Sequence, residues 1–287
     1  MPADNAAARP APRRRGRAEV LPPVAHGEAG AGHTQALSRG LAVLEALAAT
    51  EGGATLTAIA EAVALPLPTV YRLLSTLSER GYVHQGPAGE WRVGVRAFRV
   101  GAAFLDQRNL VVQAYPFLER LMQTSGETTN LAVIDGSEAV FVEQVPCREL
   151  MRMSTKLGAR APLHASGVGK AMLAAMDPGA AAALLCGRTL SRHTGKTITD
   201  RAALWRELAL IRDRGWAQDD EEHAEGLCCL ASALWDENGA PWAAISVAGP
   251  TSRITAARVG NLGTLVRATA AALTAALGGH PPRPASR

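Results

Sequence analysis

Residues 55–95, TLTAIAEAVALPLPTVYRLLSTLSERGYVHQGPAGEWRVGV, place two short amphipathic helices ahead of a tight hairpin. The first helix has apolar residues at helical spacing, and Thr55 is positioned to cap its N-terminus. The second helix is predicted to begin at Pro68, which suits the first helical position because an N–H would have no partner there. The residues predicted to be buried are Leu56, Ile59, Ala60 and Val63 in the first helix, and Val70, Leu73, Leu74 and Leu77 in the second.

Strand-like runs at residues 82–85 and 90–93 flank the turn 86–89 (GPAG), which predicts a β-hairpin. Helix, turn, helix and hairpin in this order are typical of a winged helix-turn-helix, whose second helix enters the major groove of DNA. The outward side of that helix carries short hydroxyls, one aromatic ring and one arginine, which can reach phosphates and base edges. The residues predicted to contact DNA are Arg39, Thr69, Tyr71, Arg72, Ser75 and Thr76.

The charge of this unit gives only weak support to DNA binding. Residues 35–95 contain four arginines and five glutamates, whereas positive charge dominates affinity for the phosphate backbone. A small helical hairpin that does not bind DNA would show the same apolar pattern. If the unit does bind DNA, part of its affinity is expected to come from the pairing of units in an oligomer and from the arginine-rich N-terminal tail.

The composition of the whole chain is that of a globular protein. Its 287 residues and 30.0 kDa are enough for two domains, and its net charge of +4 is compatible with a nucleic-acid partner. No apolar run is long enough to span a membrane and no signal-peptide core is present, so we expect a cytoplasmic protein with no membrane partner. The four cysteines lack metal-site spacing, so neither a zinc site nor a cofactor is expected.

The hydrophobic pattern beyond the hairpin predicts an α+β two-domain protein. Strands are expected at residues 127–135, 138–145, 228–235 and 242–247, and helices at 110–125, 166–176, 178–186, 200–214 and 256–277. The predicted divisions are a disordered tail at 1–32, a winged helix-turn-helix at 33–94, a linker helix at 95–109, a ligand-binding domain at 110–279 and a second tail at 280–287.

Two clusters in the second domain can bind a ligand. Ser166 can cap the helix that follows it, and the N–H groups at a helix start form an anion site, although a plain capped helix would have the same sequence. Residues 219–223 (DDEEH) place four carboxylates beside a histidine, and a divalent-metal site is therefore one interpretation of this run. Neighbouring side chains of an extended segment face opposite ways, so one site cannot use them all, and we assign no metal ligand.

An enzyme that acts on a small carboxylic acid is an alternative for this domain. Ser166 with His164, or Cys229 with His223, are potential nucleophile and base pairs. Closeness in sequence establishes neither their geometry nor an oxyanion site, so we assign no catalytic residue and do not expect an enzyme.

Together these motifs resemble the IclR family of transcriptional regulators, over residues 34–279. The resemblance rests on residues 56–74 with Tyr82 and Val83, on 163–170 (LHASGVGK), on 219–223 (DDEEH) and on 244–250 (AISVAGP). It implies a winged helix-turn-helix, a linker helix and a GAF-like effector-binding domain. It also implies a homodimer or tetramer that binds a double-stranded DNA operator, as a repressor.

Residues 125–128, 150–154, 219–227 and 249–255 further resemble the branch of the family that controls glyoxylate-bypass genes. That resemblance implies glyoxylate and pyruvate as small carboxylic acid effectors with opposing effects. The implied effector-binding residues are Leu150, Met153 and Ala161 as an apolar wall, Gly167 and Val168 as backbone donors, and Asp219, Cys229 and Ser246 as polar contacts. Ala248 replaces an expected serine and Ala161 a larger residue, so an aromatic acid from another catabolic pathway remains an alternative effector.

Overall fold

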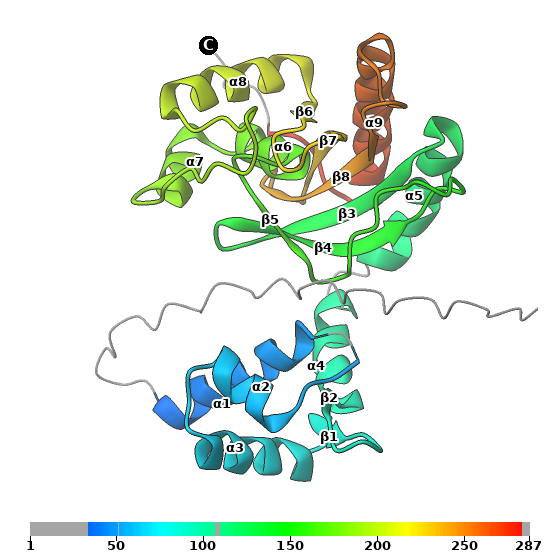
Figure 1. The fold of residues 1–287 in the computed structure, drawn as a ribbon. Helices are drawn as coiled ribbons and strands as arrows, with labels where there is room; N and C mark the ends of the chain where they lie inside the picture. The colour runs from blue at the N-terminus through cyan, green and yellow to red at the C-terminus, as the bar shows by residue number, and fades with distance from the viewer. Residues whose placement is uncertain (1–33, 51, 107–109, 283–287) are drawn as a thin grey trace, which may run out of the picture. The chain divides into compact units, whose positions relative to one another are not determined.

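The computed structural model describes residues 34–50, 52–106 and 110–282. The chain divides into two compact units, residues 1–107 and 108–287, each with a hydrophobic core of its own (Figure 1). This confirms the predicted two-domain α+β architecture. The predicted tail at 1–32, residues 107–109 of the predicted linker helix and residues 283–287 lie outside the described residues.

The N-terminal unit has the predicted order of helices and hairpin. Its elements are α1 (Gln35–Ala48), α2 (Leu56–Ala62), α3 (Leu67–Glu79), β1 (Val83–Gln85), β2 (Trp91–Val93) and α4 (Val95–Asp106). The two strands pair antiparallel, and an isolated bridge joins Ala54 to Trp91. The hairpin is therefore tied to the segment that leads into α2. The core between the helices and the hairpin is formed by Val43, Leu47, Ile59, Ala60, Val63, Val70, Leu74, Val83 and Trp91.

The starts of α2 and α3 follow from their local sequence. Thr55 caps α2 as predicted, because its hydroxyl accepts a hydrogen bond of 3.3 Å from the Ala58 N–H. Helix α3 begins one residue earlier than predicted, with Pro66 as N-cap and Leu67 as the first helical residue. Pro68 is then the second residue, which is tolerated because first-turn N–H groups have no intrahelical partner.

The C-terminal unit is built on a six-stranded antiparallel sheet with the order β5-β4-β3-β8-β7-β6. Its strands are β3 (Thr128–Asp135), β4 (Glu138–Val145), β5 (Arg160–Pro162), β6 (Ala217–Asp220), β7 (Leu227–Trp235) and β8 (Pro241–Pro250). The sequence did not predict β5 or β6. Both are edge strands of three or four residues, too short for an alternating pattern, and β6 contains two aspartates, which strands disfavour.

Helices cover both faces of this sheet (Figure 1). The helices are α5 (Leu110–Ser125), α6 (Gly167–Ala175), α7 (Pro178–Leu185), α8 (Arg201–Arg214) and α9 (Ala256–Ala276). We call the side packed by α6, α7 and α8 the α6 face, and the side packed by α5 and α9 the α9 face. None of the described helices is long and apolar enough to cross a membrane.

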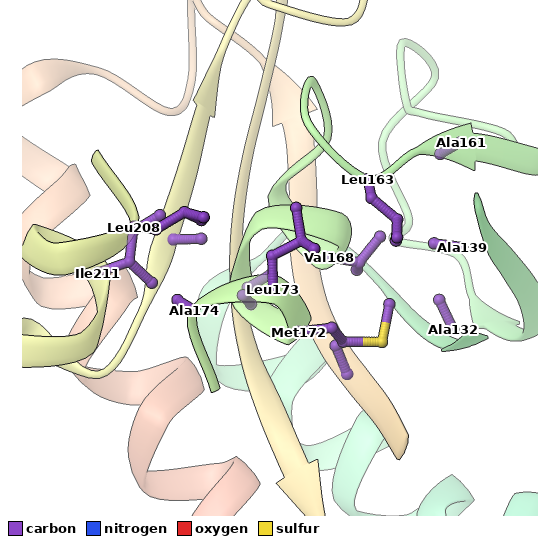
Figure 2. Packing of buried hydrophobic residues seen from close by; sticks show 14 of the residues in the cluster. Ala132, Ala139, Ala161, Leu163, Val168, Met172, Leu173, Ala174, Leu208 and Ile211 are labelled. Carbon is purple, nitrogen blue, oxygen red and sulfur yellow. The ribbon is translucent and has the colours of Figure 1, made fainter. Parts of the chain in front are cut away.

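Residue size differs between the two faces of the sheet. Alanines such as Ala132, Ala231 and Ala244 point to the α6 face, whereas larger residues such as Leu230 and Ile245 point to the α9 face. Figure 2 shows the α6-face core, in which Leu163, Val168 and Met172 lie next to one another. The small strand residues let α6 approach the sheet closely.

The four cysteines are free thiols, as expected. Cys228 belongs to the core of the α9 face, and Cys229 lies against Gly167 at the start of α6. These two neighbours therefore point to opposite faces of β7.

Gly169→Ala should destabilise the C-terminal unit. A β-carbon at Gly169 would overlap the backbone of Leu163, which cannot move aside as a flexible side chain can. Overpacking of this kind costs about 1–3 kcal/mol. Urea unfolding followed by tryptophan fluorescence would measure the loss.

Gly260→Ala is the matched control for that substitution. Gly260 lies in α9, is exposed, and has open space where a β-carbon would be. Alanine is favoured over glycine in a helix by roughly 0.8–1.0 kcal/mol, so this variant should be at least as stable as the wild type. Equal stability of the two variants would contradict the close contact between α6 and the backbone of the turn at Leu163.

Candidate functional site

The outward surface of α3 presents two side chains that can donate hydrogen bonds to DNA. Tyr71 is 55% exposed, and Arg72 is exposed beside it. Ser75 Oγ donates to the Tyr71 carbonyl and Thr76 Oγ1 to the Arg72 carbonyl, each over 2.9 Å. The protons of these two hydroxyls are thus used within the helix, and their oxygens remain as acceptors.

The other two predicted DNA contacts are less exposed. Thr69 is half-buried near the start of α3. Arg39 lies on α1 and is half-buried. Helix α1 approaches Leu73 of α3 at Gly40. No described contact joins Arg39 itself to the other predicted residues. The structure therefore brings five of the six predicted residues together on α3, with Arg39 on a different helix.

The start of α6 is capped as predicted. Ser166 Oγ accepts the Gly169 N–H over 3.1 Å and donates to the Pro162 carbonyl over 2.7 Å, while the Ser166 carbonyl accepts the Lys170 N–H. Gly167 and Val168, both buried, are therefore the first-turn residues whose N–H groups the cap does not use. A β-carbon at Gly167 would lie 2.9 Å from Cys229 Sγ, so the first residue of α6 lies directly against β7.

A buried row of polar side chains crosses the α6 face of the sheet. Gln144 Nε2 donates to Asn130 Oδ1 over 2.8 Å, and Asn130 Nδ2 donates to Ser246 Oγ over 3.3 Å. The Ser246 hydroxyl lies near Cys229, whose partner across the β6–β7 pair is Asp219. The row follows the strand order from β4 through β3, β8 and β7 to β6. Three of the residues predicted to bind an effector, Asp219, Cys229 and Ser246, are thereby brought together.

Asn130 and Gln144 belong to this row but were not predicted. An amide inside the strand TTNLAVID was the available signal, because a buried polar side chain needs a partner. That partner, Ser246, lies 116 positions away in the chain, so the sequence alone could not name it.

Asp219 is the member of the row that can change its charge near neutral pH. Its side chain is buried, with 2% of the residue exposed, and Oδ1 accepts the N–H groups of Glu222 (2.7 Å) and His223 (3.2 Å). Burial raises the pKa of Asp219 to about 7, and the two hydrogen bonds oppose that rise. The site therefore holds a carboxyl group that takes up or releases a proton under ordinary conditions.

The rest of the acidic run is neutralised by two lysines. Lys196 pairs with Asp220 over 3.1 Å and with Glu221 over 2.8 Å. Lys170 pairs with Glu222 inside the protein, where burial raises the pKa of Glu222 and the lysine opposes it. Among the described residues, no three or more His, Cys, Asp or Glu side chains are arranged to hold a metal ion.

The predicted apolar wall is only partly assembled. Ala161 lies in β5 and joins the α6-face core with Val168 (Figure 2). Met153 is half-buried, and its carbonyl accepts the Thr128 hydroxyl over 3.3 Å. Leu150 is 99% exposed in the segment between β4 and β5, so it does not pack against Ala161 or Met153 in this conformation.

Neither potential catalytic pair has the required chemistry. Ser166 Oγ is used by the helix cap, and His164 Nε2 bonds to the Ser191 carbonyl over 3.0 Å. Burial raises the pKa of Cys229 well above its usual value, which suppresses the thiolate that a nucleophile requires.

Comparisons with known proteins agree with both units. Residues 36–87 match the IclR helix-turn-helix domain, and residues 102–275 match the C-terminal domain of the bacterial transcriptional regulator IclR. The transcriptional repressor IclR of Escherichia coli K12 is 45% identical over 273 residues, which cover 94% of this chain and 98% of that protein. The acetate operon repressor of Salmonella typhimurium is 44% identical, with the same coverage.

A solved structure has the same fold. The IclR homologue of Microbacterium hydrocarbonoxydans in complex with 4-hydroxybenzoate superimposes with a TM-score of 0.75 at 27% identity, over 84% of this chain and 98% of that chain.

Asp219→Asn should flatten the pH dependence of stability of the C-terminal unit. Because the folded-state pKa is raised from 3.8 to about 7, the folded state binds this proton more tightly than the unfolded state. The stabilisation is complete below about pH 4 and is lost as pH rises through about 7. Over that window, the unfolding free energy of the wild type should fall by up to about 1.4 kcal/mol per pH unit relative to the variant. Urea unfolding from pH 4 to 8 measures this difference.

Asp220→Asn is the control for that series. Asp220 is the exposed neighbour of Asp219, so its replacement should leave the pH dependence of the unfolding free energy as it is in the wild type. If the unfolding free energy of Asp219→Asn fell with pH as steeply as that of the wild type, the buried carboxyl group of Asp219 would not titrate as stated.

Proposed function

The chain belongs to the IclR family of bacterial transcriptional regulators, and on that premise we propose that it is a repressor that releases its operator when a small carboxylic acid binds the C-terminal unit. The family's helix-turn-helix domain implies DNA binding, and Tyr71 and Arg72 are the donors that α3 presents. The observation that carries the effector half of the proposal is the buried polar row that meets the uncapped amides at the start of α6.

This arrangement has the chemistry to hold a 2-oxo acid. The N–H groups of Gly167 and Val168, at the positive end of the α6 dipole, would donate hydrogen bonds to the carboxylate oxygens. The hydroxyl of Ser246 and the amide of Asn130 follow along the sheet, where a second oxygen of the ligand would lie. Val168 would contribute the apolar boundary.

We favour glyoxylate or pyruvate over an aromatic acid as the effector. Ala161 and Ala248 are both buried, and Ala161 belongs to the α6-face core, so a benzene ring beside Ala161 would have to displace core side chains. Similarity to a protein named acetate operon repressor supports control of the glyoxylate bypass. The homologue in complex with 4-hydroxybenzoate keeps an aromatic acid as the second candidate.

An effector controls DNA binding only if its affinity differs between two states of the protein. We propose that these states are arrangements of a homodimer or tetramer on a near-palindromic operator in the cytoplasm. Pairing also supplies the affinity that a single unit with little net charge lacks.

A gel-shift series with the DNA upstream of the protein's own gene tests the function. The protein should retard this DNA, and glyoxylate or pyruvate should change the midpoint of binding more than 4-hydroxybenzoate does. The proposal fails if the protein binds this DNA no better than random DNA. Turnover of glyoxylate or pyruvate by the pure protein would favour the enzyme alternative.

Arg72→Ala should weaken binding to the operator by about 1–3 kcal/mol if the guanidinium reads a base edge. Binding to random DNA should change much less, because that binding depends on phosphates. The matched control is Arg206→Ala on the exposed side of α8, which removes an equal charge from the C-terminal unit. Equal losses on operator and random DNA would instead make Arg72 a phosphate contact.

Ala248→Ser and Ser246→Ala should change effector affinity in opposite directions. A serine at position 248 places a hydroxyl opposite Cys229, whereas Ser246→Ala removes one from the row. One hydrogen bond contributes about 0.5–1.5 kcal/mol, so titration calorimetry should show tighter and weaker binding respectively, by a few-fold to about tenfold. Ser232→Ala removes a buried hydroxyl, bonded to the Gly215 carbonyl, from the α9 face, and should leave effector affinity unchanged. Unchanged affinity in both row variants would place the effector elsewhere.

A further inference from the structure

The start of α4 is held against the end of α3. The Gly94 N–H donates to the Tyr82 carbonyl over 2.7 Å, and the Arg96 N–H donates to the Gly81 carbonyl over 3.3 Å. The Arg96 guanidinium reaches the carbonyl of Arg80, the C-cap of α3, over 3.5 Å. A β-carbon at Gly94 would overlap the Gly81 carbonyl, so the two backbones are in direct contact. The first turns of α4 are therefore part of the DNA-binding unit in space as well as in sequence.

An open hollow of about 370 Å³ lies at this junction, lined by Tyr82, Arg96, Arg99 and Val100. Both arginines are exposed, and neither forms an ion pair with a carboxylate among the described residues. Arg92 of the hairpin, in contrast, is paired with Glu90 over 2.7 Å. No carboxylate in the part of the chain that the structure describes therefore neutralises the positive charge of this hollow.

These arginines change the charge of the unit. Residues 67–100 contain five arginines (Arg72, Arg80, Arg92, Arg96 and Arg99) and two glutamates (Glu79 and Glu90), a difference of +3. A count that stops at residue 95 misses the two arginines that line the hollow. The positive charge expected of a DNA-binding domain is therefore concentrated beside the end of α3.

We propose that the hollow lined by Tyr82, Arg96 and Arg99 binds a backbone phosphate of the operator, beside the base pairs that α3 contacts. Guanidinium groups match the geometry of a phosphate and bind it through two parallel hydrogen bonds. Phosphate contacts fix the register of a helix in the groove without reading sequence, and tyrosine side chains contribute to such contacts. This inference rests on the proposed function, since it requires a DNA-bound state.

Arg99→Ala tests the proposal with the full-length chain. Arg99 is the better choice because Arg96 also bonds to the Arg80 carbonyl, so its loss would disturb the end of α3. Binding to operator and to random DNA is measured from 50 to 200 mM salt. The slope of log K against log salt should become shallower by about 0.9 for each copy bound, equally on both DNAs.

Two controls accompany this variant. Arg99→Lys keeps the charge and should keep the slope of the wild type, and Arg206→Ala should keep it as well. A wild-type slope in Arg99→Ala, in a protein that still binds the operator, overturns the phosphate contact. A protein that binds no DNA at any salt concentration would refute the proposed function instead.

A free anion is the other possible source of the phosphate. Thermal unfolding without DNA, with and without inorganic phosphate, separates the two sources. Stabilisation by phosphate that Arg99→Ala abolishes, together with an unchanged DNA slope, would assign the hollow to a free anion and overturn the inference. A shallower DNA slope supports it.

Discussion

The close approach of α6 to the sheet is the constraint on which the rest of the C-terminal unit depends. Gly167 lies against Cys229 of β7, and Gly169 lies against the backbone of Leu163 in the turn before the helix, so neither position of α6 has room for a side chain of its own. Alanines on the facing strands make the same approach possible from the other side. As a result, backbone N–H groups at the helix start lie beside polar side chains of the sheet. In this buried environment, electrostatic interactions are stronger than in water.

Such a site is useful only if its polar groups stay in place. Two sets of contacts hold the segment that carries Asp219. Lys170 forms an ion pair with Glu222. The hydroxyls of Thr194 and Thr197 donate to the carbonyls of Glu221 (2.6 Å) and Glu222 (2.7 Å), respectively. The exposed pairs of Lys196 add little, because surface ion pairs contribute about 0–1 kcal/mol. The buried pair differs: removal of either partner would leave an uncompensated charge inside the protein. Each of the four consecutive carboxylates thus has a defined hydrogen-bond or ion-pair partner within the protein.

The sequence predicted what depends on local pattern and missed what depends on distant contacts. Helix α5 and strand β4 were predicted with their observed ends, because each has a long periodic pattern bounded by turn residues. The edge strands β5 and β6 were missed because they are strands only through pairing with β4 and β7. Lys170 and Glu222 were missed because they pair across 52 positions. Leu150 was placed by resemblance, which assigns a residue to a site but not the conformation of the segment that carries it.

The charge of the N-terminal unit bears on how an effector could act. Residues 35–106 contain six arginines against five glutamates and one aspartate, so the positive charge at the end of α3 is offset elsewhere in the unit. A single unit therefore gains limited free energy from phosphates, and occupancy depends on two or more units binding together. A coupling free energy of about 1–3 kcal/mol between two sites changes affinity roughly 5- to 150-fold. If each copy bound DNA tightly by itself, such a change would leave the operator occupied. When the bound state depends on copies acting together, the same change is enough to release it. Low charge on the DNA-binding unit is therefore a condition under which a small ligand can switch the protein.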